Sequence, residues 1–146
     1  MEWTIKKFTE LTTTELYTLL RLRSEVFVVE QDCVYPDLDG KDFPALHVMA
    51  WEGDTLMAYT RILPPGISYD EASIGRVVTA PIARNTGLGR VLMEKTIAYT
   101  RKAYPGSAIR ISAQEHLKGF YSSLGFTVMS ETYLEDGIPH IEMLLV

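Results

Sequence analysis

Apolar and polar residues follow two different periods at the start of the chain, and these periods predict its first elements. A weak two-residue alternation over residues 3–8 is typical of a half-buried strand. Apolar positions at helical spacing come next, and Thr12 stands three residues before Glu15, which is the pattern of a capping box. We therefore expect a strand over residues 3–8 and then a helix that begins at Thr12 and continues towards Val29.

The remaining pattern predicts a mixed sheet. Two apolar runs are joined by Gly53-Asp54, as in an antiparallel hairpin. Further on, a strand, a helix and another strand form one unit, which implies a parallel crossover. The fold class is therefore α/β (α+β), with a mixed, mostly antiparallel sheet flanked by helices. Its predicted members are strands over residues 46–52, 55–63, 73–79 and 109–113, helices over 88–102 and 116–124, and final strands over 127–134 and 138–146.

Composition narrows the class of protein. The chain has 146 residues, of which 47% are hydrophobic and 23% charged, so we expect one globular domain over residues 1–146. A net charge of −5 without any basic run argues against nucleic acid as a partner. Cys33 is the only cysteine, which excludes an internal disulfide and suits a reducing compartment. Because no signal-like or long apolar segment is found, we expect a cytoplasmic protein with no membrane partner.

Residues 84–90 join a predicted strand to a predicted helix, with Gly87 and Gly89 set between Arg84 and Arg90. The first N–H groups of a helix lack partners and carry partial positive charge, so a phosphate binds there where no side chain obstructs it. Arginines pair readily with phosphate oxygens. The same letters also suit a plain glycine turn with two solvated arginines. The loop motifs of nucleotide triphosphatases and of dinucleotide-binding folds are both absent.

Two further segments stand on either side of this turn. The strand containing residues 74–77 precedes it, and a Tyr-x-x-x-Gly-Phe segment, residues 121–126, follows it. Together with Arg-x-x-Gly-x-Gly, these segments resemble the GNAT superfamily of acyl-CoA-dependent N-acetyltransferases. The resemblance covers nearly the whole chain and is closer still to the ElaA-like group of bacteria. The segments that carry this closer resemblance are residues 26–31, 37–42, 74–77, Gln114 with His116-Leu117, and 135–140.

The resemblance implies that acetyl-CoA is the acyl donor. The backbone of Val77, Val78 and Thr79 would bind the pantetheine arm and stabilise the oxyanion, provided that this strand parts from the one over residues 109–113. Tyr121 is the implied general acid, since a phenol can protonate or hydrogen-bond to a departing thiolate at modest cost. A glutamine also stands where many relatives carry a pantetheine-binding asparagine. The remaining implied cofactor-binding residues are that Gln114 and Arg84, Asn85, Thr86, Gly87, Leu88, Gly89 and Arg90.

The acceptor amine must lose a proton before it attacks, so a base or a chain of water molecules is needed. The candidate bases are Glu30, Glu115, His116 and His140. His116 and Glu30 come first because they lie in the segments that resemble the ElaA-like group. Each also has a structural explanation, since a histidine beside a helix start often only caps it. Arg76 is expected either to orient the substrate or to form a buried ion pair with a carboxylate such as Glu30.

The loop over residues 30–42 is rich in carboxylates and has Lys41 as its one basic residue. It does not match a calcium loop, because Lys41 falls at a ligand position and Asp42 where the sharp-turn glycine belongs. The histidines lack the paired spacing of a zinc site. We therefore predict no metal. The loop is expected either to steer a cationic amine by its charge or simply to be a solvated acidic segment.

Three functions remain compatible with the sequence. The leading one is acetyl transfer to a small-molecule or peptide amine, and the second is a non-catalytic acyl-CoA-binding module. The third, transfer from an acyl carrier protein, is disfavoured because such carriers are acidic and seek basic patches. The identity of the amine does not emerge from the sequence. A homodimer is possible if the apolar C-terminal run, residues 141–146, forms an edge strand.

Overall fold

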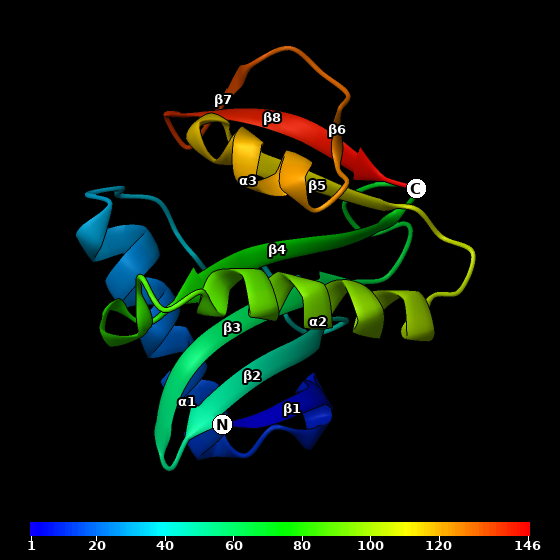
Figure 1. Ribbon diagram of the computed structural model, residues 1–146. Coiled ribbons are helices and arrows are strands. Elements are labelled where there is room, and N and C mark those ends of the chain that lie inside the picture. The colour runs from blue at the N-terminus through cyan, green and yellow to red at the C-terminus, as the bar shows by residue number, and fades with distance from the viewer.

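A mixed eight-stranded sheet runs through the molecule, and helices pack on both of its faces (Figure 1). The computed structural model describes residues 1–146. The strand order is β1-β2-β3-β4-β5-β8-β6, with β7 also paired to β8. Only β4 and β5 are parallel, which confirms the predicted fold class. The strands are β1 (Glu2–Lys7), β2 (Leu46–Glu52), β3 (Thr55–Leu63), β4 (Ala72–Thr79), β5 (Ile109–Gln114), β6 (Thr127–Val128), β7 (Tyr133–Glu135) and β8 (Ile138–Leu145).

The helices are α1 (Thr13–Arg23), α2 (Leu88–Ala103) and α3 (Lys118–Ser123). Short turns of 3-10 helix lie at η1 (Phe8–Glu10), η3 (Pro81–Ala83) and η4 (Glu115–Leu117), and a π-helix, η2 (Ser24–Glu30), extends α1. The predicted capping box is confirmed, since the Thr12 hydroxyl accepts from the Glu15 N–H at 3.0 Å and the Thr12 N–H donates to Glu15 at 2.8 Å. No helix has both the length and the apolar character required to cross a membrane.

Alternate residues of the central strands face opposite layers of helix. Met49 of β2 packs with Leu19 and Leu22 of α1, whereas Val48, one residue earlier, packs with Leu92 of α2. This is the two-residue period of a strand with both faces buried. Helix α3 lies on the same side as α2, because its Tyr121 shares a core cluster with α2 residue Met93. Helices thus cover both faces of the sheet at its centre. A binding site within the sheet therefore requires a place where neighbouring strands separate.

That break lies between the two parallel strands. β4 and β5 pair only at their beginnings, through Ala72 with Ile109 and Ser73 with Arg110. Beyond Ser73 the strands part, and the register of β4 against β3 shifts in the same stretch. Arg76 at this bulge has a φ of 50°, a left-handed conformation that costs a non-glycine residue about 1–3 kcal/mol. The separation that the implied pantetheine site required is therefore present.

The C-terminal part departs from the prediction of one strand over residues 127–134. Two short strands form instead, and their registers against β8 differ: Thr127 pairs with Leu144, but Tyr133 pairs with His140. Extra residues between them bulge out of the ladder, where Ser130 accepts a hydrogen bond from the Glu142 N–H at 2.9 Å. A side chain thus substitutes for the missing backbone partner, which period-two reasoning does not detect.

The C-terminal run does not form an edge strand, so the condition set for pairing across a dimer is not met. β8 has β5 on one side and β6 and β7 on the other, so both of its edges are occupied over most of its length. Pairing of the run over residues 141–146 across a dimer is therefore excluded as an edge-to-edge contact. The free edges of the sheet belong to β1 at one end and to β6 and β7 at the other.

Candidate active site

A cleft of about 500 Å³ opens where β4 and β5 part. Residues 73–77 of β4 form one wall and residues 111–114 of β5 form the other. The end of η2, the loop after it and the turn after β7 complete the lining, and Cys33 of that loop lies 3.5 Å from the Asp136 carbonyl oxygen of that turn. The cleft therefore brings together segments from the first quarter, the middle and the end of the chain. Gln114, an expected cofactor contact, lies in its wall.

Tyr121 reaches this cleft from α3. Its ring packs edge-on against Phe120 and Phe126, with centroid distances of 5.1 and 6.0 Å. Burial raises the pKa of the Tyr121 phenol to about 12, because the phenolate would be poorly solvated there. The hydroxyl consequently stays protonated at neutral pH and is available as a proton donor. The tyrosine expected as general acid thus lies at the cleft in the required protonation state.

The glycine turn forms a second hollow at the start of α2. Gly87 is the N-cap residue with a φ of 79°, and no side chain caps the helix there. A Cβ placed on Gly89 would meet no atom within 4 Å, so the space in front of the helix N-terminus is open. Arg84 and Arg90 line this hollow together with Thr79 at the end of β4. The turn therefore has the open amide surface that an anion site needs.

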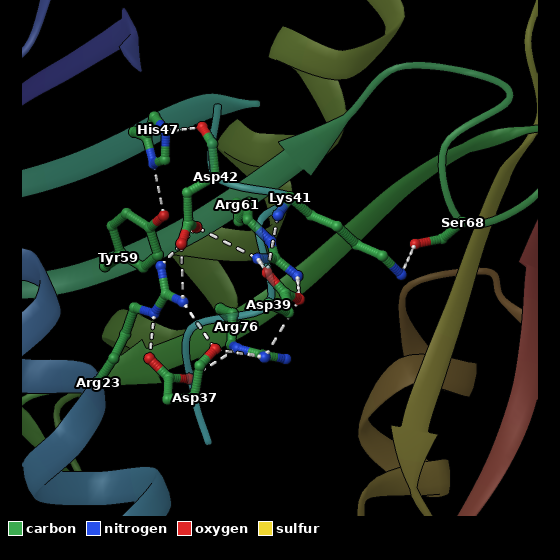
Figure 2. Close-up of polar contacts among 10 residues, drawn as sticks. All are labelled: Arg23, Asp37, Asp39, Lys41, Asp42, His47, Tyr59, Arg61, Ser68 and Arg76. Atoms are coloured by element: carbon green, nitrogen blue, oxygen red, sulfur yellow. Dashed lines mark hydrogen bonds and ion pairs between the residues drawn. The ribbon is translucent and has the colours of Figure 1, made fainter. Parts of the chain in front are cut away.

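A network of ion pairs fixes the loop after η2 against the sheet (Figure 2). Arg23, fully buried at the end of α1, donates to Asp37 at 2.8 Å and to Asp42 at 2.7 Å. Arg76 of β4 donates to the other oxygen of Asp37, also at 2.8 Å. Arg61 of β3 binds Asp39 with two hydrogen bonds of 2.8 Å each and reaches Asp42 at 3.2 Å.

Electrostatics keep this network ionised. Burial alone would raise the pKa of Asp42, but the hydrogen bond from Arg23 and the guanidinium charges outweigh it and hold that pKa below its usual range. Asp39 behaves alike, since Arg61 overcomes the effect of burial. Beneath them His47 donates from Nε2 to the Asp42 carbonyl at 2.9 Å, and its Nδ1 contacts the Tyr59 hydroxyl at 2.6 Å. Burial lowers the pKa of His47, so this histidine is a neutral structural contact.

The network corrects two predictions. The acidic loop is not mainly a solvated or steering segment, because Asp37, Asp39 and Asp42 point inward onto arginines. Arg76 does form an ion pair, yet with Asp37 and Asp39 rather than with Glu30. The ion pairs of Arg23 were not predicted. Their only signal in the sequence was a charged residue on the otherwise apolar stripe of α1.

The two favoured base candidates lie outside the cleft. The Glu30 carboxylate binds Arg84 through hydrogen bonds of 2.6 and 2.9 Å, and this contact lowers the pKa of Glu30. His116 is exposed on η4 and does not line the cleft. His140 does line it, and so does Glu135, a residue that was not predicted. Its signal was its position in the segment over residues 135–140, which resembles the ElaA-like group.

Removing Arg23 is expected to destabilise the fold strongly. Arg23→Met leaves Asp37 and Asp42 buried with fewer partners, and breaking such buried pairs costs about 3–5 kcal/mol. The matched control is Arg21→Met, whose side chain is 61% exposed and whose pair with Glu25 spans 3.8 Å. The control should lose no more than about 1 kcal/mol. Urea unfolding of both variants tests this, and equal losses would show that the network contributes little.

Stability should fall in acid. The folded-state pKa values of Asp39 and Asp42 lie below their unfolded value of about 3.9, so their contribution is complete at neutral pH and is lost as pH falls below about 5. Asp39→Asn should flatten this decline, whereas Asp54→Asn, in the exposed β2–β3 turn, should not. Urea midpoints at a series of pH values from 7 to about 3 measure the slope. Identical slopes for wild type and Asp39→Asn would contradict the assignment.

Comparison with known proteins agrees with this geometry. Residues 21–146 match the family model described as an acetyltransferase (GNAT) domain. Protein ElaA of Escherichia coli is 42% identical over 145 residues, covering 98% of this chain and 95% of its own. An acyl-CoA N-acyltransferase structure from Pseudomonas aeruginosa is 44% identical with a TM-score of 0.95, covering 99% of each chain.

A more distant structure shares only the fold. An aminoglycoside 6'-N-acetyltransferase complexed with coenzyme A has a TM-score of 0.71 at 16% identity, covering 97% of this chain and 95% of its own. The crystal structure of Escherichia coli ElaA is far nearer, with a TM-score of 0.93 at 41% identity and 99% coverage of both chains. The site of this protein combines two parallel strands that part, a glycine turn before a helix and a tyrosine at the cleft. The chain belongs to the GNAT acetyltransferase family, in its ElaA-like group.

Proposed function

We propose that this protein transfers an acetyl group from acetyl-CoA directly to the primary amine of a small molecule or a peptide. The observation that carries the proposal is the separation of β4 from β5, which share backbone pairing only at Ala72 and Ser73. An extended thioester arm fits such a gap, because it can take over the hydrogen bonds that a neighbouring strand would otherwise make. The gap also leads to Tyr121.

The cofactor would bind along β4 and at the start of α2. Its diphosphate meets the open N-terminus at Gly87 and Gly89, where backbone donors and the helix dipole favour negative charge. The pantetheine arm follows Val77 to Thr79, and one N–H of that strand stabilises the oxyanion. Arg84 must exchange its contact with Glu30 for a phosphate oxygen. These assignments are supported by the open space in front of Gly89 and by the unpaired stretch of β4.

The chemistry requires a balanced set of proton transfers. A neutral amine attacks the thioester carbonyl, and a C–N bond forms as the carbonyl becomes an oxyanion. When the intermediate collapses, the C–S bond breaks and the thiolate takes a proton from Tyr121. The phenol has a pKa of about 12, whereas a thiol has a pKa of about 8.5. The phenolate therefore regains a proton promptly, and this proton comes from the attacking nitrogen as it becomes the amide. The products are the acetylated amine and free CoA.

Adding a methyl group at Gly89 should weaken cofactor binding. Gly89→Ala meets no atom within 4 Å in the free protein, so the fold should be unaffected, but the methyl enters the space proposed for the diphosphate. We expect acetyl-CoA affinity to fall at least about tenfold, or about 1.4 kcal/mol, by calorimetry. Gly119→Ala on α3, which also meets no atom within 4 Å, is the control. Unchanged affinity of Gly89→Ala would move the diphosphate away from this turn.

Removing the Tyr121 hydroxyl should slow turnover and spare binding. For Tyr121→Phe we expect kcat to fall about 10²–10⁴-fold, the usual contribution of a general acid, with little change in acetyl-CoA affinity. Tyr17→Phe, at a side chain that is 69% exposed, is the control. Free CoA released in the presence of an amine library measures the rate. Binding of acetyl-CoA without any amine-dependent release would instead indicate a non-catalytic acyl-CoA-binding module.

A further inference from the structure

His140 and Glu135 lie next to each other in the wall of the cleft. Both residues line the cleft that Tyr121 also reaches. They belong to adjacent strands: Glu135 ends β7, and His140 lies in β8 opposite Tyr133. The Nε2 atom of His140 lies 3.4 Å from a Glu135 carboxylate oxygen. An ammonium group that enters the cleft would therefore meet an imidazole nitrogen and a carboxylate side by side.

The hydrogen bonds around His140 determine which nitrogen is basic. Nδ1 lies 2.7 Å from the carbonyl oxygen of Ile138. A carbonyl only accepts hydrogen bonds, so Nδ1 carries the hydrogen and the lone pair of the neutral ring lies on Nε2. The ring stacks on Tyr133 at a centroid distance of 6.3 Å, and its side chain is only 9% exposed. The imidazole is thus fixed with its basic nitrogen towards Glu135.

Glu135 is held in turn from β5. Its second carboxylate oxygen accepts a hydrogen bond of 3.0 Å from the Ser112 hydroxyl, which also contacts the Tyr133 hydroxyl. The carboxylate itself remains 46% exposed and has no arginine or lysine partner. The other ionisable groups near the pair are Tyr69, Tyr133, Asp136, Cys33 and Tyr121 at the cleft, Glu142 and Arg110 further along the sheet, which pair with each other at 3.6 Å, and the exposed Glu115 and His116 of η4.

The other candidate bases are occupied or misplaced. Glu30 is bound to Arg84, and Glu115 and His116 lie outside the cleft. His47 has both ring nitrogens in hydrogen bonds beneath the ion-pair network. Asp37 lines the cleft but is tied to Arg23 and Arg76. Only the pair of His140 and Glu135 combines access to the cleft with a free nitrogen lone pair.

We propose that Nε2 of His140 takes the proton that the acceptor amine must lose, and that Glu135 attracts the ammonium and then stabilises the imidazolium. This inference rests on the proposed N-acetyl transfer. An N–H bond of the ammonium breaks and an Nε2–H bond forms, so one positive charge moves from the amine to the ring while the carboxylate compensates it in both states. His140 releases this proton to solvent at the end of the cycle. The acceptor is accordingly an amine that arrives protonated.

The pH dependence of turnover tests the roles. Imidazole exchanges protons near neutral pH, so His140→Gln should lower kcat/KM about 10²–10⁴-fold at neutral pH and should recover as the amine itself deprotonates at alkaline pH. Added imidazole should partly restore His140→Ala. Glu135→Gln should lower kcat and raise KM for the amine, and Glu135→Asp should restore part of both effects. Glu131→Gln, at an exposed position, is the control.

Several results would overturn the inference. A His140→Gln profile that matches wild type removes His140 from proton transfer, as does a loss of rate confined to His116→Gln. A loss that is the same at every pH and is not rescued by imidazole would indicate a structural role only. Acetyl-CoA affinity, measured in parallel by calorimetry, should remain at the wild-type value in every His140 and Glu135 variant.

Nitrogen NMR of the imidazoles separates this inference from the proposed function. The chain has three histidines, so His140→Gln assigns the His140 signals without ambiguity. We expect hydrogen on Nδ1 and the lone pair on Nε2 in the neutral ring, and an Nε2 signal that changes in Glu135→Gln but not in Glu131→Gln. Hydrogen on Nε2 of the neutral ring, or an Nε2 signal insensitive to Glu135→Gln, would contradict the pair even if the enzyme turns over. If the wild type releases no CoA with any amine, the proposed function is contradicted. The NMR signals of His140 still test the pair of His140 and Glu135 in that case.

Discussion

The bulge at Arg76 is the constraint on which the rest of the site depends. A left-handed backbone conformation is unfavourable for an arginine inside a strand. Arg76 keeps this conformation because its guanidinium donates to the carboxylate and the carbonyl of Asp37 at 2.8 and 2.9 Å. The same Asp37 is bound by the buried Arg23 of α1. Helix α1 and the loop after η2 thus hold β4 in the shape that parts it from β5. Without that shape, the parallel strands could pair along their length and the cleft would close.

The buried ion pairs fix one position of the loop more than they stabilise the fold. Desolvation of Arg23, Asp42 and Arg61 offsets much of their mutual attraction, so an apolar replacement of the whole network need not be less stable. Apolar side chains, however, would not fix the backbone of the loop at one position. The directional hydrogen bonds do so, and they place the loop over residues 37–42 as one side of the cleft. Loss of a single partner is costly because the others remain buried.

The proposed reaction needs one group that donates a proton to the leaving thiolate and another that accepts a proton from the amine. Burial among aromatic rings raises the pKa of Tyr121 to about 12, so the phenol is protonated when the thiolate leaves. In the proposed mechanism His140, with Nδ1 facing a backbone carbonyl and Nε2 beside a carboxylate, accepts the proton of the amine. One group belongs to α3 and the other to β8, on strands and helices that the core fixes. In the proposed mechanism the proton donor and the proton acceptor therefore belong to different elements that line the same cleft.

Sequence alone determined the features that arise from neighbouring residues: the capping box of Thr12 and Glu15, the β2–β3 hairpin, the open turn at Gly89 and the mixed sheet. Local hydrogen bonds, turn conformations and side-chain periods extend over a few residues, so the letters contain them. Only the tertiary structure decided which carboxylates turn inward and which histidine faces the cleft. Arg23 and Asp42 are 19 residues apart, and Ser112 and Glu135 are 23 apart, so their contacts exist only once the strands have paired. The broken strand after α3 has the same origin, because Ser130 replaces a backbone partner only when β8 is already beside it.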